Sequence, residues 1–163
     1  MAIITIVGSG MMGSAIGIPA SENGHEIRLV GTPLDREIIN HARETGWHLN
    51  MRRQLPARYK YYQFDELTQA LAGADALVSG VSSFGVDWFL QTVLPIIPEN
   101  LPVLAVTKGM IEEDGRLIPY PLYYKRQLGS LRRNLNAVGG PCTSYELRAP
   151  DQTYRPFCGG AAA

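Results

Sequence analysis

The sequence predicts a doubly wound α/β fold, with a mostly parallel sheet between two layers of helices. Strand-like and helix-like segments alternate along the 163 residues, and several strand-like segments are continuous apolar runs without polar alternation. Such runs are typical of parallel strands that helices cover on both faces. We find no internal repeat and no interdomain linker. We therefore expect a single domain over residues 1–158, followed by a disordered tail or truncation scar at 159–163.

The N-terminal segment predicts a strand–helix–strand unit. An apolar, β-branched strand is expected at Ala2–Val7, and residues 11–22 follow with small and apolar side chains at helical spacing. Pro19 lies inside this helix and predicts a kink or an early end, because proline removes a backbone hydrogen bond. Asn23-Gly24 supplies the C-terminal stop, and Ile27–Val30 is the second strand.

The alternation continues to the end of the chain. Thr32 is expected to cap a helix that starts at Pro33 and ends before Gly46. Residues 47–63 are expected to form a long loop with a short strand at Tyr59–Gln63. The remaining expected elements are a helix at Asp65–Leu71, a strand at Ala76–Gly80, a helix through Val86 and Val93, a strand at Leu101–Val106, a helix at 119–131, a strand at 134–138, a helix at 143–149 and a strand at 153–158.

Composition limits the classes of function. The chain is 45% hydrophobic and 18% charged, which is typical of a soluble globular protein and excludes disordered and fibrous classes. The 15 Lys and Arg residues balance the 15 Asp and Glu residues, so no net charge recruits a nucleic acid or an anionic membrane. The N-terminal apolar run is too short to span a membrane and lacks the basic residues of a signal peptide. Cys142 and Cys158 are too few for a disulfide scaffold, so we expect reduced thiols in a cytoplasmic protein.

A glycine motif follows the first strand. Residues 8–13 read GSGMMG and fit the pattern G-x-G-x-x-G, directly after a buried strand and at the start of a helix, as a dinucleotide fingerprint requires. Gly8 suits a tight turn, Gly10 lets the backbone approach a pyrophosphate, and Gly13 allows close helix–strand packing. The pyrophosphate would lie on free N–H groups at the helix N-terminus. The motif therefore predicts a Rossmann-type domain that binds NAD or NADP.

The residues after each strand are the other candidates, because ligands in open α/β sheets bind beyond the carboxyl ends of the strands. Gly31-Thr32 follows the second strand and selects neither NAD nor NADP, and Thr32 is as compatible with a helix cap as with a ribose contact. Lys108, after the fifth strand, has the charge to hold a phosphate or polarise a carbonyl, although a solvated surface lysine is the alternative. The other residues at these ends are Ser82, Ser83, Phe84, Thr107 and Gly140 to Ser144.

Ordinary explanations are preferred for the remaining candidates. His25, His41 and His48 have no metal-ligand spacing, so we expect no metal site. The basic and aromatic stretch at 52–60 invites a nucleic-acid interpretation, but a solvated loop fits the balanced charge better. Cys142 stands where a thiolate would be stabilised, yet no general base accompanies it.

Five segments together resemble the cofactor domain of NAD(P)-dependent glycerol-3-phosphate dehydrogenases. They are GSGMMGSA, NGHEIRLVG, LAGADALV, VTKGM and GGPCTSYEL, and their order and spacing match the family along most of the chain. The T-K-G and G-P motifs are more specific than the glycine motif, which many dehydrogenases share. The resemblance implies an enzyme that reduces dihydroxyacetone phosphate to sn-glycerol 3-phosphate by hydride transfer, or runs the reverse, in glycerophospholipid and carbohydrate metabolism.

The resemblance also implies roles by position. Met11 and Met12 would line the cofactor, Thr32 would lie by the adenosine ribose, and Lys108 would contact both cofactor and substrate as the catalytic residue that positions the substrate. The substrate-binding residues would be Lys108, Gly140 and Cys142. The cofactor-binding residues would be Gly8, Ser9, Gly10, Met11, Met12, Gly13, Thr32, Ser82, Phe84, Lys108 and Ser144.

The sequence departs from the family in several places. The family usually has serine or alanine at Cys142, commonly has lysine, arginine or serine at Tyr145, and has a β-branched strand where Pro156 lies. The family's proton-donating lysine and its phosphate clamp belong to a C-terminal helical domain that is absent from this sequence. We therefore expect the cofactor-binding half of an enzyme with a small phosphorylated substrate, and the resemblance makes a homodimer possible in the full-length enzyme.

Two alternatives stay open on the sequence alone. One is the cofactor domain of another two-domain hydroxyacid or ketoacid dehydrogenase. The other is a non-catalytic nucleotide-binding module from a truncated gene product.

Overall fold

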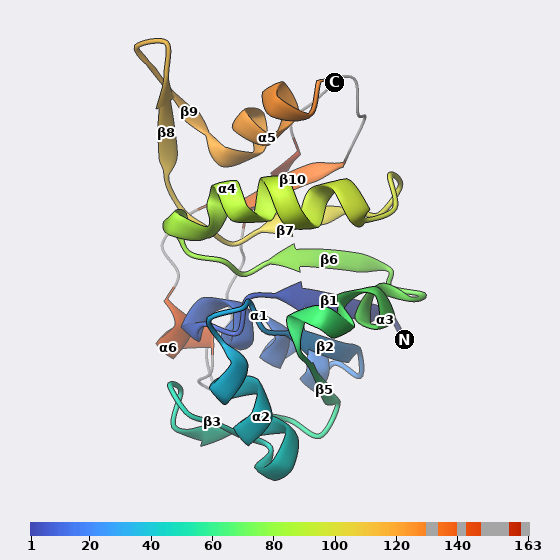
Figure 1. Ribbon diagram of the computed structural model, residues 1–163. Coiled ribbons are helices and arrows are strands. Elements are labelled where there is room, and N and C mark those ends of the chain that lie inside the picture. The colour runs from blue at the N-terminus through green and yellow to red at the C-terminus, as the bar shows by residue number, and fades with distance from the viewer. Residues whose placement is uncertain (130–133, 140–142, 148–156, 161–163) are drawn as a thin grey trace.

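A seven-stranded sheet forms the centre of the protein (Figure 1). The computed structural model describes residues 1–129, 134–139, 143–147 and 157–160. All neighbouring strands pair in parallel except the last two of the chain, which are antiparallel. The order of the strands is β11 (Phe157–Gly160), β10 (Leu135–Gly139), β7 (Val103–Ala105), β6 (Ala76–Ser79), β1 (Ile3–Val7), β2 (Glu26–Val30) and β5 (Tyr59–Tyr62).

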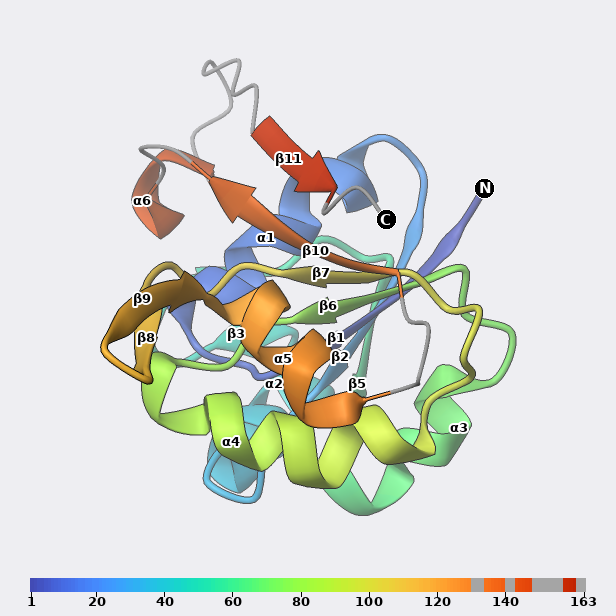
Figure 2. The same ribbon diagram turned by 90° about the horizontal axis from the view of Figure 1, so that it is seen from above.

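Helices cover both faces of this sheet (Figure 2). One face carries α1 (Met11–Glu22) and α6 (Ser144–Leu147). The other carries α3 (Leu67–Leu71), α4 (Val86–Trp88) and α5 (Tyr120–Leu128). The coil of α4 continues as a π-helical turn at Phe89–Val93 and a 3-10 turn at Leu94–Ile96, and a 3-10 turn at Phe64–Glu66 precedes α3. The last helix, α2 (Arg36–Thr45), packs on β5. The doubly wound, three-layer α/β fold predicted by the sequence is confirmed.

The apolar strands are buried from both sides. Ile6 and Val7 of β1 and Leu29 of β2 have no exposed surface, and burial of each such side chain contributes about 1.5–3 kcal/mol. Thr5 is the polar exception on β1, and its hydroxyl donates to the Ala70 carbonyl at 2.7 Å. The sheet is thus a rigid frame that fixes where the loops at its carboxyl ends begin.

Thr32 does not cap α2, and the helix does not start at Pro33. It starts at Arg36, with Asp35 at the N-cap. The Asp35 carboxylate instead accepts hydrogen bonds from the Thr32 N–H (2.9 Å) and hydroxyl (2.8 Å), while the Asp35 N–H donates to the Thr32 carbonyl. These bonds fold residues 32–35 into a separate turn, which delays the helix by about one turn.

Pro19 does not end α1, so the early end expected from it is wrong. The helix continues to Glu22 and stops at Asn23, whose N–H donates to the Pro19 carbonyl at 3.1 Å. A proline removes its own hydrogen bond and crowds the carbonyl four residues before it, but Ile18, which is 1% exposed, keeps this part of the helix packed on the sheet. The stop expected at Asn23-Gly24 is confirmed.

Two antiparallel hairpins occur where the sequence predicted none. The segment 47–54 was expected to be loop but contains β3 (Trp47–His48) paired with β4 (Arg53–Gln54). The second hairpin pairs β8 (Met110–Glu113) with β9 (Arg116–Pro119), so the helix expected from 119 begins only at Tyr120. At the C-terminal end, β11 includes Gly159 and Gly160, which the sequence placed in the tail.

Candidate functional site

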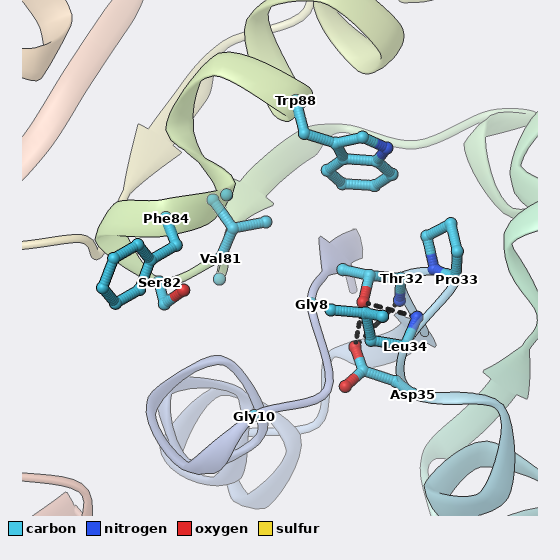
Figure 3. A pocket seen from close by; sticks show the side chains of 12 residues that line it. Gly8, Gly10, Thr32, Pro33, Leu34, Asp35, Val81, Ser82, Phe84 and Trp88 are labelled. Carbon is cyan, nitrogen blue, oxygen red and sulfur yellow. Dashed lines mark hydrogen bonds between the residues drawn. The ribbon is translucent and has the colours of Figure 1, made fainter.

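A cavity of about 480 Å³ lies at the carboxyl ends of β1, β2 and β6 (Figure 3). β1 pairs with β2 on one side and with β6 on the other. From β1 the chain first builds the sheet outward through β2 and β5, then crosses back to β6 and continues the other way. Loops diverge at such a switch point and leave a crevice, which is where ligands bind in open α/β sheets.

Three glycines hold the end of α1 against the ends of β1 and β6. A Cβ added at Gly13 would lie 2.1 Å from the Gly8 carbonyl oxygen, and one added at Gly8 would lie 2.7 Å from the Gly80 carbonyl carbon. Gly8 also has φ +108°, which other residues rarely adopt. The roles predicted for Gly8 in the turn and Gly13 in close packing are therefore confirmed. Gly80 was missed, although a glycine directly after a buried strand was the signal available.

Gly10 differs from these three because space is open in front of it. Among the described residues, no atom other than those of its chain neighbours lies within 4 Å of a Cβ added there, and Gly10 lines the cavity. α1 begins at the next residue, so its first N–H groups lack intrahelical acceptors and carry the positive end of the helix dipole. This wall of the cavity therefore suits a negatively charged group that comes close to the backbone.

The side chains between the glycines do not line the cavity. Ser9 is completely buried; its N–H donates to the Asp35 carboxylate at 3.3 Å, and its carbonyl lies 2.9 Å from His48 Nε2. Met11 and Met12 are partly buried and pack against the apolar cluster on the α1 face of the sheet. The cofactor contacts expected of these three residues therefore stay predictions.

The loop after β2 forms one wall of the cavity. Thr32 and Asp35 line it and are joined by the bonds described above, which Figure 3 shows as dashed lines. Asp35 also bonds to the Ser9 N–H, so a single carboxylate connects this loop to the glycine motif. Leu34 is 94% exposed at the cavity, which offers an apolar surface to a ligand.

The loop after β6 and the start of α4 form the facing wall. Ser82 and Phe84, both predicted site residues, line the cavity, and Phe84 is 98% exposed. Trp88 also lines the cavity, opposite Thr32 and Pro33 in Figure 3. The centroid of its ring is 5.0 Å from the ring centroid of Phe64. Trp88 was not predicted from the sequence as a residue of the site, and its helical spacing from Phe84 was the available signal.

The loop after β7 reaches the same edge of the sheet. The Thr107 hydroxyl donates to the Val81 carbonyl at 2.6 Å, and Val81 lines the cavity. Lys108 follows and is exposed, outside the residues that line the cavity itself. Ser144 opens α6 on the α1 face, while Gly140 and Cys142 lie outside the described residues.

Two kinds of site are absent from the described parts of the chain: a cluster of metal ligands and a membrane-spanning helix. Within residues 1–129, 134–139, 143–147 and 157–160, no group of three His, Cys, Asp or Glu side chains is placed to hold a metal ion. Across those same ranges, no helix has both the length and the apolar character needed to cross a membrane.

Comparisons with known proteins agree with this geometry. Residues 3–153 match the family of the NAD-dependent glycerol-3-phosphate dehydrogenase N-terminus. The chain is 30% identical over 145 residues to the NADP(+)-dependent glycerol-3-phosphate dehydrogenase of Archaeoglobus fulgidus, with 89% of this chain and 43% of that protein covered. It is 28% identical to the glycerol-3-phosphate dehydrogenase [NAD(P)+] of Shouchella clausii, with 90% and 43% covered.

A solved structure shows the same fold. The crystal structure of glycerol-3-phosphate dehydrogenase from Coxiella burnetii has a TM-score of 0.72 at 21% identity, with 90% of this chain and 43% of that chain covered. The chain thus spans 43% of the length of these relatives. Because the family match extends over nearly the whole chain, the protein belongs to the NAD-dependent glycerol-3-phosphate dehydrogenase N-terminal domain family.

Proposed function

We propose that this chain is the cofactor-binding half of an NAD(P)-dependent glycerol-3-phosphate dehydrogenase and that NAD or NADP binds in the cavity. The observation that carries the proposal is the contrast among the glycines. Gly8, Gly13 and Gly80 are packed against backbone, whereas Gly10 opens onto the cavity at the start of α1. A dinucleotide needs such an arrangement, because its pyrophosphate approaches the backbone at the second glycine of the motif.

Each wall of the cavity is assigned a different part of the cofactor. The N-terminus of α1 would hold the pyrophosphate, because its N–H groups and the helix dipole favour an anion. The exposed side chain of Leu34 and the ring of Trp88 would hold the adenosine, because their apolar surfaces suit a flat base. Thr32 lies beside the ribose, and Ser82 and Phe84 hold the middle of the dinucleotide.

Lys108 is assigned the substrate side of the reaction. The bound nicotinamide supplies the hydride, and the protein supplies orientation and charge. Lys108 lies past β7, at the same edge of the sheet as the cavity, where an ammonium group orients a small phosphorylated substrate and stabilises charge on its carbonyl oxygen. Ser144 is assigned to the cofactor, and Gly140 and Cys142 to the substrate. We place the activity in cytoplasmic glycerophospholipid and carbohydrate metabolism, in a full-length homodimer.

Calorimetry of the chain with NADH and NADPH tests the cofactor part. We expect binding of at least one of them, and loss of binding in Gly10→Asp, because the new side chain and its charge occupy the place of the pyrophosphate. Gln69→Asp is the matched control, since it puts the same charge on the exposed surface of α3. A folded wild-type chain that binds neither nucleotide would defeat the proposal.

The substrate part needs an assay of the full-length protein that contains this chain. We expect NAD(P)H oxidation with dihydroxyacetone phosphate to exceed that with any of a panel of 2-oxo acids. Preference for an oxo acid would instead support another dehydrogenase of the same two-domain type.

A further inference from the structure

His48 contacts the backbone of the glycine motif, although it belongs to β3, which is distant from the motif in the sequence. Its side chain has no exposed surface. Nε2 is 2.9 Å from the Ser9 carbonyl oxygen and 2.8 Å from the Ser14 hydroxyl, and Nδ1 accepts the Met51 N–H at 3.1 Å. Both ring nitrogens therefore have partners, and one of those partners is the backbone of the motif itself.

The hydrogen bonds define the tautomer of this ring. Nδ1 accepts a backbone N–H and so carries no proton, which places the proton of the neutral ring on Nε2. Nε2–H then donates to the Ser9 carbonyl, with the Ser14 hydroxyl as a second acceptor. Burial lowers the pKa of His48, against the opposing effects of its bond to Ser9 and the charge of Asp35, so the neutral form is favoured at pH 7.

The bond to Ser9 determines where the next N–H points. In a trans peptide the carbonyl and the N–H point in opposite directions. The Ser9 carbonyl is turned inward to His48, so the N–H of Gly10, in the same peptide unit, is turned the opposite way. Ser9 is held on its other side by its N–H bond to Asp35.

We propose that His48 is a positioning residue for nucleotide binding: it holds the Ser9 carbonyl inward so that the N–H of Gly10 is presented to the pyrophosphate. This inference rests on the proposed function and assigns it a residue outside the cavity lining. A histidine that only filled the core would be replaceable by an apolar side chain of similar size without any effect on the ligand.

Two substitutions separate the positioning role from packing. His48→Met fills the space but cannot donate, whereas the amide of His48→Gln can donate to Ser9 from a similar place. Binding is measured by calorimetry with ADP-ribose, which contains the pyrophosphate, and with adenosine, which does not. We expect His48→Met to weaken ADP-ribose by about tenfold, or about 1.4 kcal/mol, with adenosine unchanged and most of the loss recovered in His48→Gln.

The outcomes distinguish this inference from the proposed function. His41→Gln, at a partly buried position of α2, is the matched control and should bind like the wild type. If wild-type chain binds ADP-ribose and His48→Met binds it equally well, the positioning role is refuted while the cofactor site stands. If the folded wild-type chain binds none of ADP-ribose, NADH and NADPH, both are refuted.

If His48→Met does not fold, the positioning role can still be tested on the wild-type chain. Nitrogen-15 spectra of the histidine rings report which nitrogen carries the proton. We expect the Nε2-protonated form of His48 at pH 7, and we expect it to persist when ADP-ribose binds. An Nδ1-protonated ring would leave no donor for Ser9 and would overturn the proposal.

Discussion

Alanine at Gly13 and at Gly10 should have opposite effects on stability and binding, because the two glycines have different surroundings. A Cβ at Gly13 would be 2.1 Å from the Gly8 oxygen, whereas real Cβ atoms essentially never come under 3.0 Å, so the groups must separate by about 0.9 Å. The Gly8 oxygen belongs to the backbone and a Cβ is fixed rigidly to its Cα, so α1 and the turn must move. Forced overpacking of this kind costs about 1–3 kcal/mol, and we expect Gly13→Ala to lose that much free energy of unfolding.

Gly10→Ala should leave the fold almost unchanged. In the part of the chain that the structure describes, only the chain neighbours of Gly10 come within 4 Å of the new Cβ, and the backbone of Gly10, at φ −67° and ψ 178°, suits alanine. Its methyl group would instead occupy space needed by the pyrophosphate. We expect a change in unfolding free energy within about 0.5 kcal/mol and a fall in NADH affinity of at least about tenfold, or about 1.4 kcal/mol.

Urea denaturation and calorimetry, applied to both variants, measure the two quantities separately. The reasoning is refuted if Gly13→Ala is as stable as the wild type, because the backbone contact would then be relieved at no cost. It is also refuted if Gly10→Ala binds NADH with unchanged affinity, because the open space at Gly10 would then not be the cofactor's.

Three further predictions concern other parts of the site. Because the pKa of His48 is lowered in the folded protein, the unfolded chain takes up a proton on this residue first as pH falls below 6.5. The free energy of unfolding should therefore decline below this pH, and it should decline less steeply in His48→Gln. Urea titrations between pH 6.5 and 5 would show both effects. NADH should quench the fluorescence of Trp88, so quenching should persist in Trp47→Phe and disappear in Trp88→Phe; the reverse pattern would remove Trp88 from the site. Asp35→Ala should cost about 1–3 kcal/mol of unfolding free energy and weaken NADH binding, because the Ser9 N–H loses its acceptor. Unchanged NADH affinity would show that the carboxylate stabilises only the turn and does not support the cofactor site.

Local signals allowed the fold and the core of the site to be predicted. Gly8, Gly10 and Gly13 lie within six residues, directly after an apolar strand, so the motif and its context are visible together in the sequence. The loop after β6 could be placed by the same reasoning, because any residue that follows a parallel strand reaches the carboxyl edge of the sheet. Ser82 and Phe84 follow β6 in this way, and both line the cavity.

The misses have two different causes. Asp114-Gly115 is a two-residue turn signal that was present and overlooked, and the structure has both residues at positive φ, 54° and 74°, between β8 and β9. The prediction that a helix starts at Pro33 was wrong for another reason. A proline suits the first turn of a helix, but the Asp35 carboxylate is drawn into bonds with Thr32 and with the distant Ser9, and that second partner is not visible in local sequence.

The residues that hold the cavity open are those hardest to recognise from sequence, because each acts across a long separation. His48 and Asp35 fix the two peptide units of Ser9, and the Thr107 hydroxyl fixes the Val81 carbonyl in the facing wall. Each bond joins a different segment to a loop that lines the crevice, so the loops are held by the protein before a ligand arrives. Binding to loops already held in place costs less conformational entropy than binding to mobile ones. For the proposed cofactor site we therefore expect His48, Asp35 and Thr107, which hold the loops, to contribute as much to affinity as Gly10, which faces the cavity.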